Sequence, residues 1–354
     1  MSWIESLSPE KQFLLFSAVK ILAAIAVLMP MIAYSVMAER RIAALIQDRL
    51  GPNRVGPFGL LQPLADGIKS FMKEDFTPSH VRKAYFWIAP AITMIPALMT
   101  IAVIPFGSNL GSPNSKMVIA DLNVGILYTF GIVSLGVYGI VLAGYAANSK
   151  YPFLGGIRSS AQLISYEIAM GMSVIPVFML VGSLNLGDVV SYQAGGIFHW
   201  LIFKQPIGFM IFLIAAFAET NRLPFDLPES EQELVGGYNT EYSSMKFALF
   251  FMGEYANVIL SSAMMVTLFF GGWSLPIAGL DQPAQTLGTG LLHIGIFLGK
   301  IAAFVVFFIW VRWMLPRFRY DQLMHLGWQR FIPLALANIA VTAVILWMLA
   351  KPVL

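Results

Sequence analysis

The segment AETNRLPFDLPESEQELVGGYNTEY, residues 218–242, lies between two long apolar runs, and this alternation decides the class of fold. Each flanking run can cross a bilayer, which requires about 20 apolar residues in a helix. The segment itself holds six carboxylates and one basic residue, Arg222. Acidic residues this dense beside a membrane are expected where protons or cations are handled.

The composition of the whole chain indicates the same class. Of its 354 residues, 58% are hydrophobic and 12% are charged, whereas about 25% are charged in an average soluble domain. We predict an all-α polytopic membrane protein, one integral membrane domain over residues 1–354, with long inner loops at 38–83 and 219–242. The eight predicted spans are 13–38, 84–106, 122–147, 160–182, 200–219, 243–270, 290–311 and 330–350.

The distribution of Lys and Arg predicts the orientation. The loops after the first, third, fifth and seventh spans hold 16 of the 22 basic residues. Because basic loops stay on the inner side, both termini are expected on the outer, periplasmic side. The acidic segment then faces inward, which does not change the assignment, since acidic residues contribute little to orientation.

Residues that hold metals or redox centres are scarce. The chain has no cysteine and only four histidines, His80, His199, His293 and His325. Disulfides and thiolate-ligated iron–sulfur clusters are therefore excluded on this chain, and no pair of histidines has metal or haem spacing. We predict no metal and no bound redox cofactor, so any redox centres would lie on other polypeptides.

The first inner loop predicts an amphipathic surface helix. Leu61, Leu64, Ile68 and Phe71 recur at spacings of three and four residues, which places them on one helical face. Such a helix can seal the edge of the membrane domain, or it can form a lip that guides a lipid-soluble substrate into a cavity. The pattern alone does not choose between these roles.

Two carboxylates are predicted inside spans, Glu167 and Glu254. A charged group at the bilayer centre costs at least ~2.5 kcal/mol unless it is paired, protonated or hydrated. The functional interpretation is a path for protons or water, and the structural one is a neutral acid hydrogen-bonded to a neighbouring helix. The acidic segment has its own alternative, an exposed loop that docks a basic partner.

Three long motifs resemble one known family. They are residues 218–242, GLLQPLADGIKSFMKED (59–75) and LPRFRYDQLMHLGWQRFIPLALAN (315–338). In this order they are similar to the signatures of the quinone-chamber membrane subunit of respiratory complex I, an NADH:quinone oxidoreductase. The resemblance covers nearly the whole chain, including the number of spans and the polarity of the loops.

The resemblance implies a function and two sets of residues. Members of the family form the tunnel through which quinone leaves the bilayer, while FMN and the iron–sulfur clusters lie on partner subunits. The tunnel and its entrance would involve Glu39, Arg40, Arg41, Arg54, Asp66, Lys69, Arg222, Phe225 and Asp226. A proton path would involve Glu167, Glu219, Glu229, Glu231, Glu233, Glu241 and Glu254.

The resemblance also implies a setting. The expected partners are the quinone-module subunits of the peripheral arm, small membrane subunits, antiporter-like subunits, quinone and membrane lipids, in a bacterial inner membrane. Nucleic acid is not expected. Two alternatives remain open at this point: the related membrane subunit of a group 4 hydrogenase or formate hydrogenlyase, and a stand-alone secondary transporter with a carboxylate-lined path.

Overall fold

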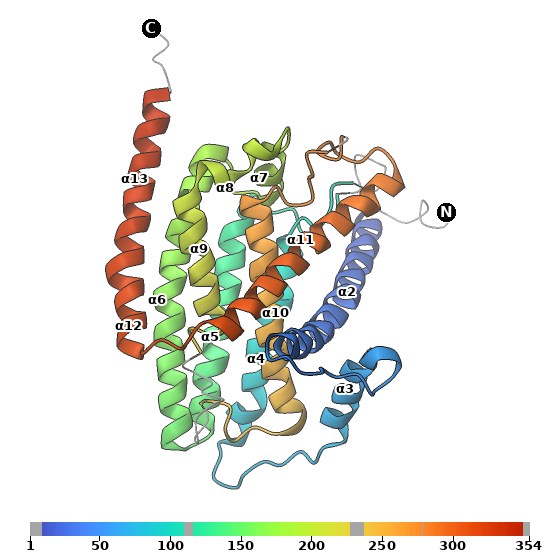
Figure 1. The fold of residues 1–354 in the computed structure, drawn as a ribbon, viewed down its shortest axis with the longest axis vertical. Helices are drawn as coiled ribbons and strands as arrows, with labels where there is room; N and C mark the ends of the chain where they lie inside the picture. Colours follow the sequence, from blue (N-terminus) through green and yellow to red (C-terminus); the bar gives the residue numbers. More distant parts are fainter. Residues whose placement is uncertain (1–8, 110–115, 227–236, 278, 350–354) are drawn as a thin grey trace.

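The protein is a bundle of membrane-spanning helices (Figure 1). The computed structural model describes residues 9–109, 116–226, 237–277 and 279–349. In these ranges seven helical segments are long and apolar enough to cross a membrane, which confirms the predicted all-α polytopic class. They are α2 (Pro9–Ile46), α4 (Lys83–Thr100, extended to Val103), α5 (Gly125–Ala146), α6 (Lys150–Val181), α10 (Ser244–Phe269), α11 (Leu287–Met314) and the continuous segment Tyr320–Leu349.

The predicted span 200–219 differs from the others because it is broken. It consists of α8 (Leu201–Lys204) and α9 (Pro206–Glu219), which is only 14 residues long. At 1.5 Å per residue α9 is about 21 Å long, less than the ~30 Å of hydrocarbon. Pro206 has no N–H to continue α8 and instead begins a new helix. The predicted segment is therefore helical but interrupted at Gln205, and it is not among the seven helices long enough to cross on length alone.

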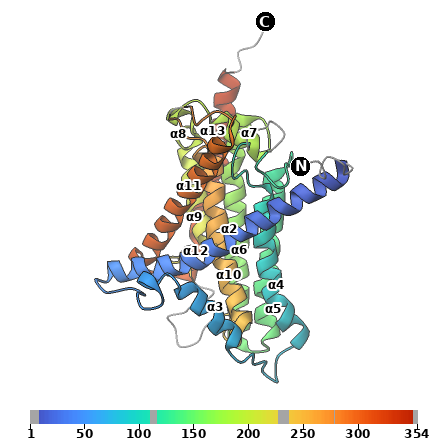
Figure 2. The ribbon, with the colours of Figure 1, turned by 90° about the vertical axis from the view of Figure 1, so that its right-hand side faces the viewer.

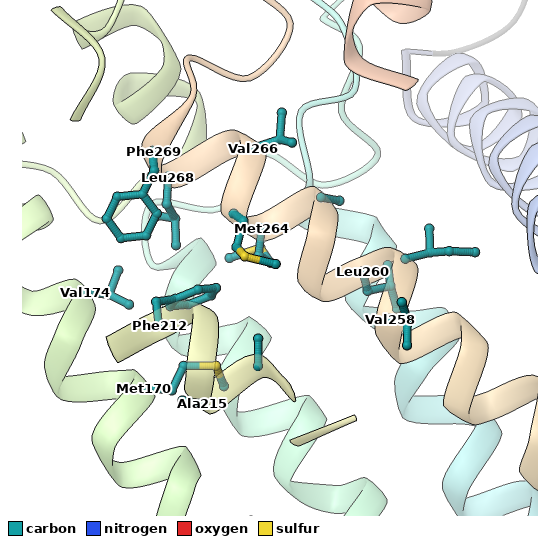
Figure 3. Packing of buried hydrophobic residues seen from close by; sticks show 14 of the residues in the cluster. Met170, Val174, Phe212, Ala215, Val258, Leu260, Met264, Val266, Leu268 and Phe269 are labelled. Carbon is teal, nitrogen blue, oxygen red and sulfur yellow. The ribbon is translucent and has the colours of Figure 1, made fainter. Parts of the chain in front are cut away.

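Helix α10 is the centre of the bundle. In its most apolar window 78% of residues are buried, against 17% in the last span. It packs against α4, α2, α11 and α9, while α6 joins α5, α9 and α13 (Ile332–Leu349) around it. Figure 3 shows part of this core, in which residues of α6, α9 and α10 interlock: Met170, Val174, Phe212, Ala215, Met264 and Phe269.

The first and last helices both have their terminal ends at the upper end of the bundle in Figure 1. Near that end of α2, the Lys20 ammonium donates to the carbonyl oxygens of Lys116 and Val118, at 2.8 and 3.0 Å. This loop after α4 is one that the basic residues assign to the outer side. The loop and the terminal ends of α2 and of the last helix thus lie at the same end of the bundle, and the membrane side that this end faces stays a prediction.

The predicted amphipathic helix is α3 (Gln62–Met72), which lies beside the inner ends of α2 and α10 (Figure 2). Leu64, Ile68 and Phe71 are exposed, at 62%, 55% and 73%. The apolar face therefore turns away from the described part of this chain, as expected of a helix that lies in a membrane interface.

A close helix contact offers a test of the bundle. A Cβ atom added to Gly139 of α5 would lie 2.2 Å from Thr93 Oγ1 and 2.8 Å from the Thr93 backbone nitrogen on α4. We expect Gly139→Ala to cost roughly 1–3 kcal/mol of stability, because overpacking forces the two helices apart. The midpoint of thermal unfolding in detergent should fall by several degrees.

Gly131→Ala is the matched control, since it changes the same residue type on the same helix. A Cβ atom at Gly131 meets no described atom within 4 Å. This variant should be neutral or slightly stabilised, because Ala has a higher helix propensity than Gly. Equal behaviour of the two variants would contradict the packing of α4 on α5.

Candidate functional site

The strongest concentration of charge in the bundle is a buried ion cluster, which we define as Glu39, Arg222, Glu254, Tyr255 and Arg312. Arg222 Nη1 lies 3.2 Å from Glu39 Oε2, and Arg222 Nε lies 2.5 Å from Glu254 Oε1. Both acids and Arg222 are less than 9% exposed. Arg222 therefore joins the carboxylates of two different helices, α2 and α10.

The other members complete the cluster from the α10 and α11 sides. The Tyr255 hydroxyl donates to Glu39 Oε2 at 2.6 Å, and its ring lies 4.1 Å from the Arg222 guanidinium carbon. Arg312, in the last turn of α11, forms an ion pair with Glu39. Two carboxylates thus face two guanidinium groups, and this balance matters because an unpaired buried charge is costly.

The position of Arg222 depends on the tight turn that follows α9. The Gln162 side-chain amide of α6 donates to the carbonyl oxygens of Ala218 and Phe225, at 2.8 and 2.9 Å. Asn221 takes a positive φ of 51°, which Asn tolerates better than most residues. The turn therefore directs Arg222 into the bundle instead of toward the inner surface.

Two cavities flank the cluster. The acidic cavity has a volume of about 40 Å³, and its lining includes Glu167, Glu219 and Glu254. The arginine cavity has a volume of only about 10 Å³ and is lined by two groups of residues. The polar ones are Glu39, Arg222, Tyr255 and Arg312, and the apolar ones are Val258, Val305, Phe308 and Ile309. The Arg222–Glu254 pair lies where the two cavities approach each other.

Three of the predicted proton-path acids thus come together from three helices. Glu167 of α6 accepts a hydrogen bond from Ser134 of α5, and Glu219 is the last residue of α9. Glu241 is not among the residues lining the cavity, since it lies 3.8 Å from His80 Nε2 at the inner surface and is partly exposed. Glu229, Glu231 and Glu233 lie outside the described residues.

The predicted chamber residues after Arg222 lie against the chain's closing segment. Asp226, which is 4% exposed, pairs with Arg317 at 3.3 Å between Oδ2 and Nη2. The buried Phe225 ring packs between Tyr166 and Phe318, with centroid distances of 5.3 and 5.4 Å. The turn that delivers Arg222 is therefore fixed on both sides.

The predicted entrance residues form a separate group around α3. Arg40 pairs with Asp66 at 2.7 Å, and Arg41 donates to the Phe58 carbonyl. Arg54 and Lys69 are exposed. The sequence prediction thus combined two places, because Glu39 belongs to the buried ion cluster while its neighbour Arg40 belongs to the surface group.

The sequence prediction missed three residues of the site: Tyr255, Arg312 and Arg317. Both arginines lie near the inner end of α11, where basic residues were interpreted as signals of orientation. The sequence did contain a signal for the two arginines. This loop has more basic residues than a short loop needs to fix its orientation, and the buried acids of the chain must be paired with basic residues. In the described ranges, no group of three or more His, Cys, Asp or Glu residues could hold a metal ion.

Comparison with known proteins agrees with this architecture. A family model described as NADH dehydrogenase matches residues 19–343. The chain is 50% identical to an H subunit of the NADH-quinone oxidoreductase of Cytophaga hutchinsonii, over 94% of this chain and 96% of that protein. It is 53% identical to an H subunit of the Geobacter metallireducens enzyme, over 90% of this chain and 93% of that protein. It is 50% identical to the H subunit of the Rhodospirillum rubrum enzyme, over 91% of this chain and 92% of that protein.

Seven apolar spans in the described residues and these bacterial relatives make the chain an integral protein of the bacterial inner membrane. The matches cover most of the chain and most of each relative, so the likeness extends well beyond a single motif. The chain belongs to the NADH dehydrogenase family, among the membrane proteins known as the H subunits of NADH-quinone oxidoreductase.

Proposed function

We propose that this chain forms the quinone chamber of a proton-translocating NADH:quinone oxidoreductase and couples quinone reduction to proton movement. The observation that carries the proposal is the double pairing of Arg222 with Glu39 and Glu254. One partner lines the arginine cavity and the other lines the acidic cavity. A change of charge on one side therefore acts on the protonation of the other through one guanidinium group.

The lining of the arginine cavity suits a quinone better than a fully polar substrate. Its apolar residues come from α10 and α11 and suit the face of a quinone ring. Because the cavity holds only about 10 Å³, room for about one water molecule, quinone binding there requires the surrounding helices to move apart. Guanidinium groups can donate hydrogen bonds to quinone carbonyls, and they stabilise the negative charge that develops on those oxygens during reduction. Electrons would come from iron–sulfur clusters on the peripheral-arm subunits, since this chain has no cysteine.

The acidic cavity supplies the proton side. Glu167, Glu219 and Glu254 line one space, so that a proton can be shared among them through water in the cavity. From there we propose transfer toward the antiporter-like subunits, on a path in which Glu229, Glu231, Glu233 and Glu241 also take part. The names of the relatives favour this function over a hydrogenase subunit, and a stand-alone transporter has no evident use for an arginine cavity.

Removal of a charge from the acidic cavity tests the proton path. We expect Glu254→Gln to lower proton pumping per NADH by at least about tenfold. This is less than the roughly 10²–10⁴-fold contribution typical of a positioned proton-transfer group, because water can partly replace the carboxylate. Glu167→Gln should act in the same direction. Pumping is measured with a pH-sensitive dye in vesicles that contain the assembled complex.

Glu74→Gln is the control for this prediction, since Glu74 is an exposed carboxylate of the first inner loop. It makes the same chemical change and should pump normally. Normal pumping by an assembled Glu254→Gln complex would remove Glu254 from the path.

Removal of the bridging guanidinium tests the chamber. Arg222→Met leaves Glu39 and Glu254 short of a partner, and breaking a buried pair costs about 3–5 kcal/mol. The rate of quinone reduction should fall at least about tenfold. A tenfold change corresponds to only about 1.4 kcal/mol, which is less than the cost of breaking the pair. NADH oxidation with an artificial acceptor that takes electrons upstream should stay near normal.

Arg319→Met provides the comparison, because the Arg319 side chain is 80% exposed and pairs with Asp321 at the surface. It should leave both activities unchanged. If Arg222→Met lost both activities in equal proportion, the residue would serve assembly and not the chamber.

A further inference from the structure

The surface helix α3 is joined to the central helix α10 by two residues at the inner end of α10, Ser244 and Lys246. Ser244 is the first residue of α10, and its hydroxyl shares a hydrogen bond between the carbonyl oxygens of Ser70 and Lys73, 3.0 Å from each. These carbonyls belong to the last turn of α3 and its C-cap, where intrahelical partners are missing. Ser244 therefore caps another helix and not its own.

The backbone of Ser244 shows that this cap is under constraint. Its φ is +56°, in the left-handed region that non-glycine residues seldom adopt. Such a conformation costs of order 1–3 kcal/mol and persists only where the surroundings fix it. The bonds to α3 and the burial of Ser244, which is 8% exposed, are surroundings of that kind.

Lys246 makes the second connection, to the loop that follows α3. Its ammonium lies 3.0 Å from Asp75 Oδ1, 3.0 Å from Thr77 Oγ1 and 3.7 Å from the ring centroid of Trp87. The side chain is 7% exposed, which is rare for a lysine. A desolvated ammonium with a carboxylate, a hydroxyl and an indole face is held far more firmly than a surface lysine.

On its other side α3 is tied to α2 by the Arg40–Asp66 pair. The two side chains of that pair are 45% and 33% exposed. Exposed pairs contribute about 0–1 kcal/mol, so this tie is weak. The buried contacts at Ser244 and Lys246 therefore determine where α3 lies. Arg40 follows Glu39 of the ion cluster directly, so α3 is attached to α2 one residue from that cluster.

We propose that Ser244 and Lys246 form a latch that positions α3 and thereby sets the access of quinone from the bilayer to the arginine cavity. This inference rests on the proposed function. The latch holds α3 beside α2 and α10, with its apolar face turned away from the described part of the chain. Lys246 also lies eight residues from Glu254 on one helix, about 12 Å along its axis. Helix α3 and the ion cluster are thus both attached to α10. Ser244 and Lys246 act as positioning residues.

The test combines exchange and kinetics in the assembled complex. Lys246→Met keeps the aliphatic stem and removes the ammonium. We expect faster amide hydrogen exchange over residues 62–77 and a rise of about fivefold in the KM for a long-chain quinone, with kcat and the upstream acceptor activity little changed. Lys73→Met is the matched control. It removes an exposed lysine from the same segment, where the latch uses the Lys73 carbonyl and not its side chain.

Ser244→Gly is the second variant, for the case in which Lys246→Met does not assemble. Glycine accepts the positive φ without strain and removes the hydroxyl, so it opens the cap while leaving α10 intact. It should show the same exchange and KM changes.

If amide hydrogen exchange over residues 62–77 is unchanged in Lys246→Met and Ser244→Gly, the latch is overturned. Faster exchange with an unchanged quinone KM would show that α3 does not govern access, and would overturn the inference while leaving the chamber itself in place. A failure of the proposed function is recognised separately. In that case the Arg222→Met complex loses quinone reduction and the upstream acceptor activity in equal proportion.

Discussion

The structure depends on one buried guanidinium that has to satisfy two carboxylates at once. Arg222 reaches Glu39 on α2 and Glu254 on α10 from a turn after α9. Neither acid can stay charged inside the bundle without a cation, and the cation in turn needs both acids to offset its own desolvation. The turn after α9 and the end of α11, which carries Arg312, both contribute to this cluster.

The same requirement explains the irregular features of the chain. Helix α9 ends at Glu219, and the turn that carries Arg222 begins directly after it. Gln162 satisfies the carbonyls that this early ending exposes, and Phe225 and Asp226 attach the turn to the closing segment. Backbone without helical bonds is tolerated at membrane depth where it is enclosed by protein. The turn therefore brings Arg222 into the bundle without exposing polar groups to lipid.

Much of this architecture could be predicted from local pattern. Apolar run lengths predicted the spans, three- and four-residue spacing predicted α3, and the rule for intramembrane acids selected Glu167 and Glu254.

What local pattern could not supply is which charges meet. Glu39 and Arg222 are 183 residues apart, and Glu39 and Arg312 are 273 apart, so their pairing is set only when the helices pack. The break at Pro206 was missed because a proline at the start of a helix and one within it look the same in an apolar run. The sequence left two roles open for α3, guiding a lipid-soluble substrate and sealing the edge of the domain. An exposed apolar face fits both roles.

The central claim is that charge in the arginine cavity controls protonation of Glu254 through Arg222. Infrared difference spectroscopy of the assembled complex, comparing oxidised quinone with reduced quinone, measures this directly, because protonated carboxyl groups have their own C=O stretching band. We expect a carboxyl band that changes on quinone reduction and is absent from the Glu254→Gln complex. Identical difference spectra for the wild-type and Glu254→Gln complexes, with normal quinone reduction in both, would contradict it.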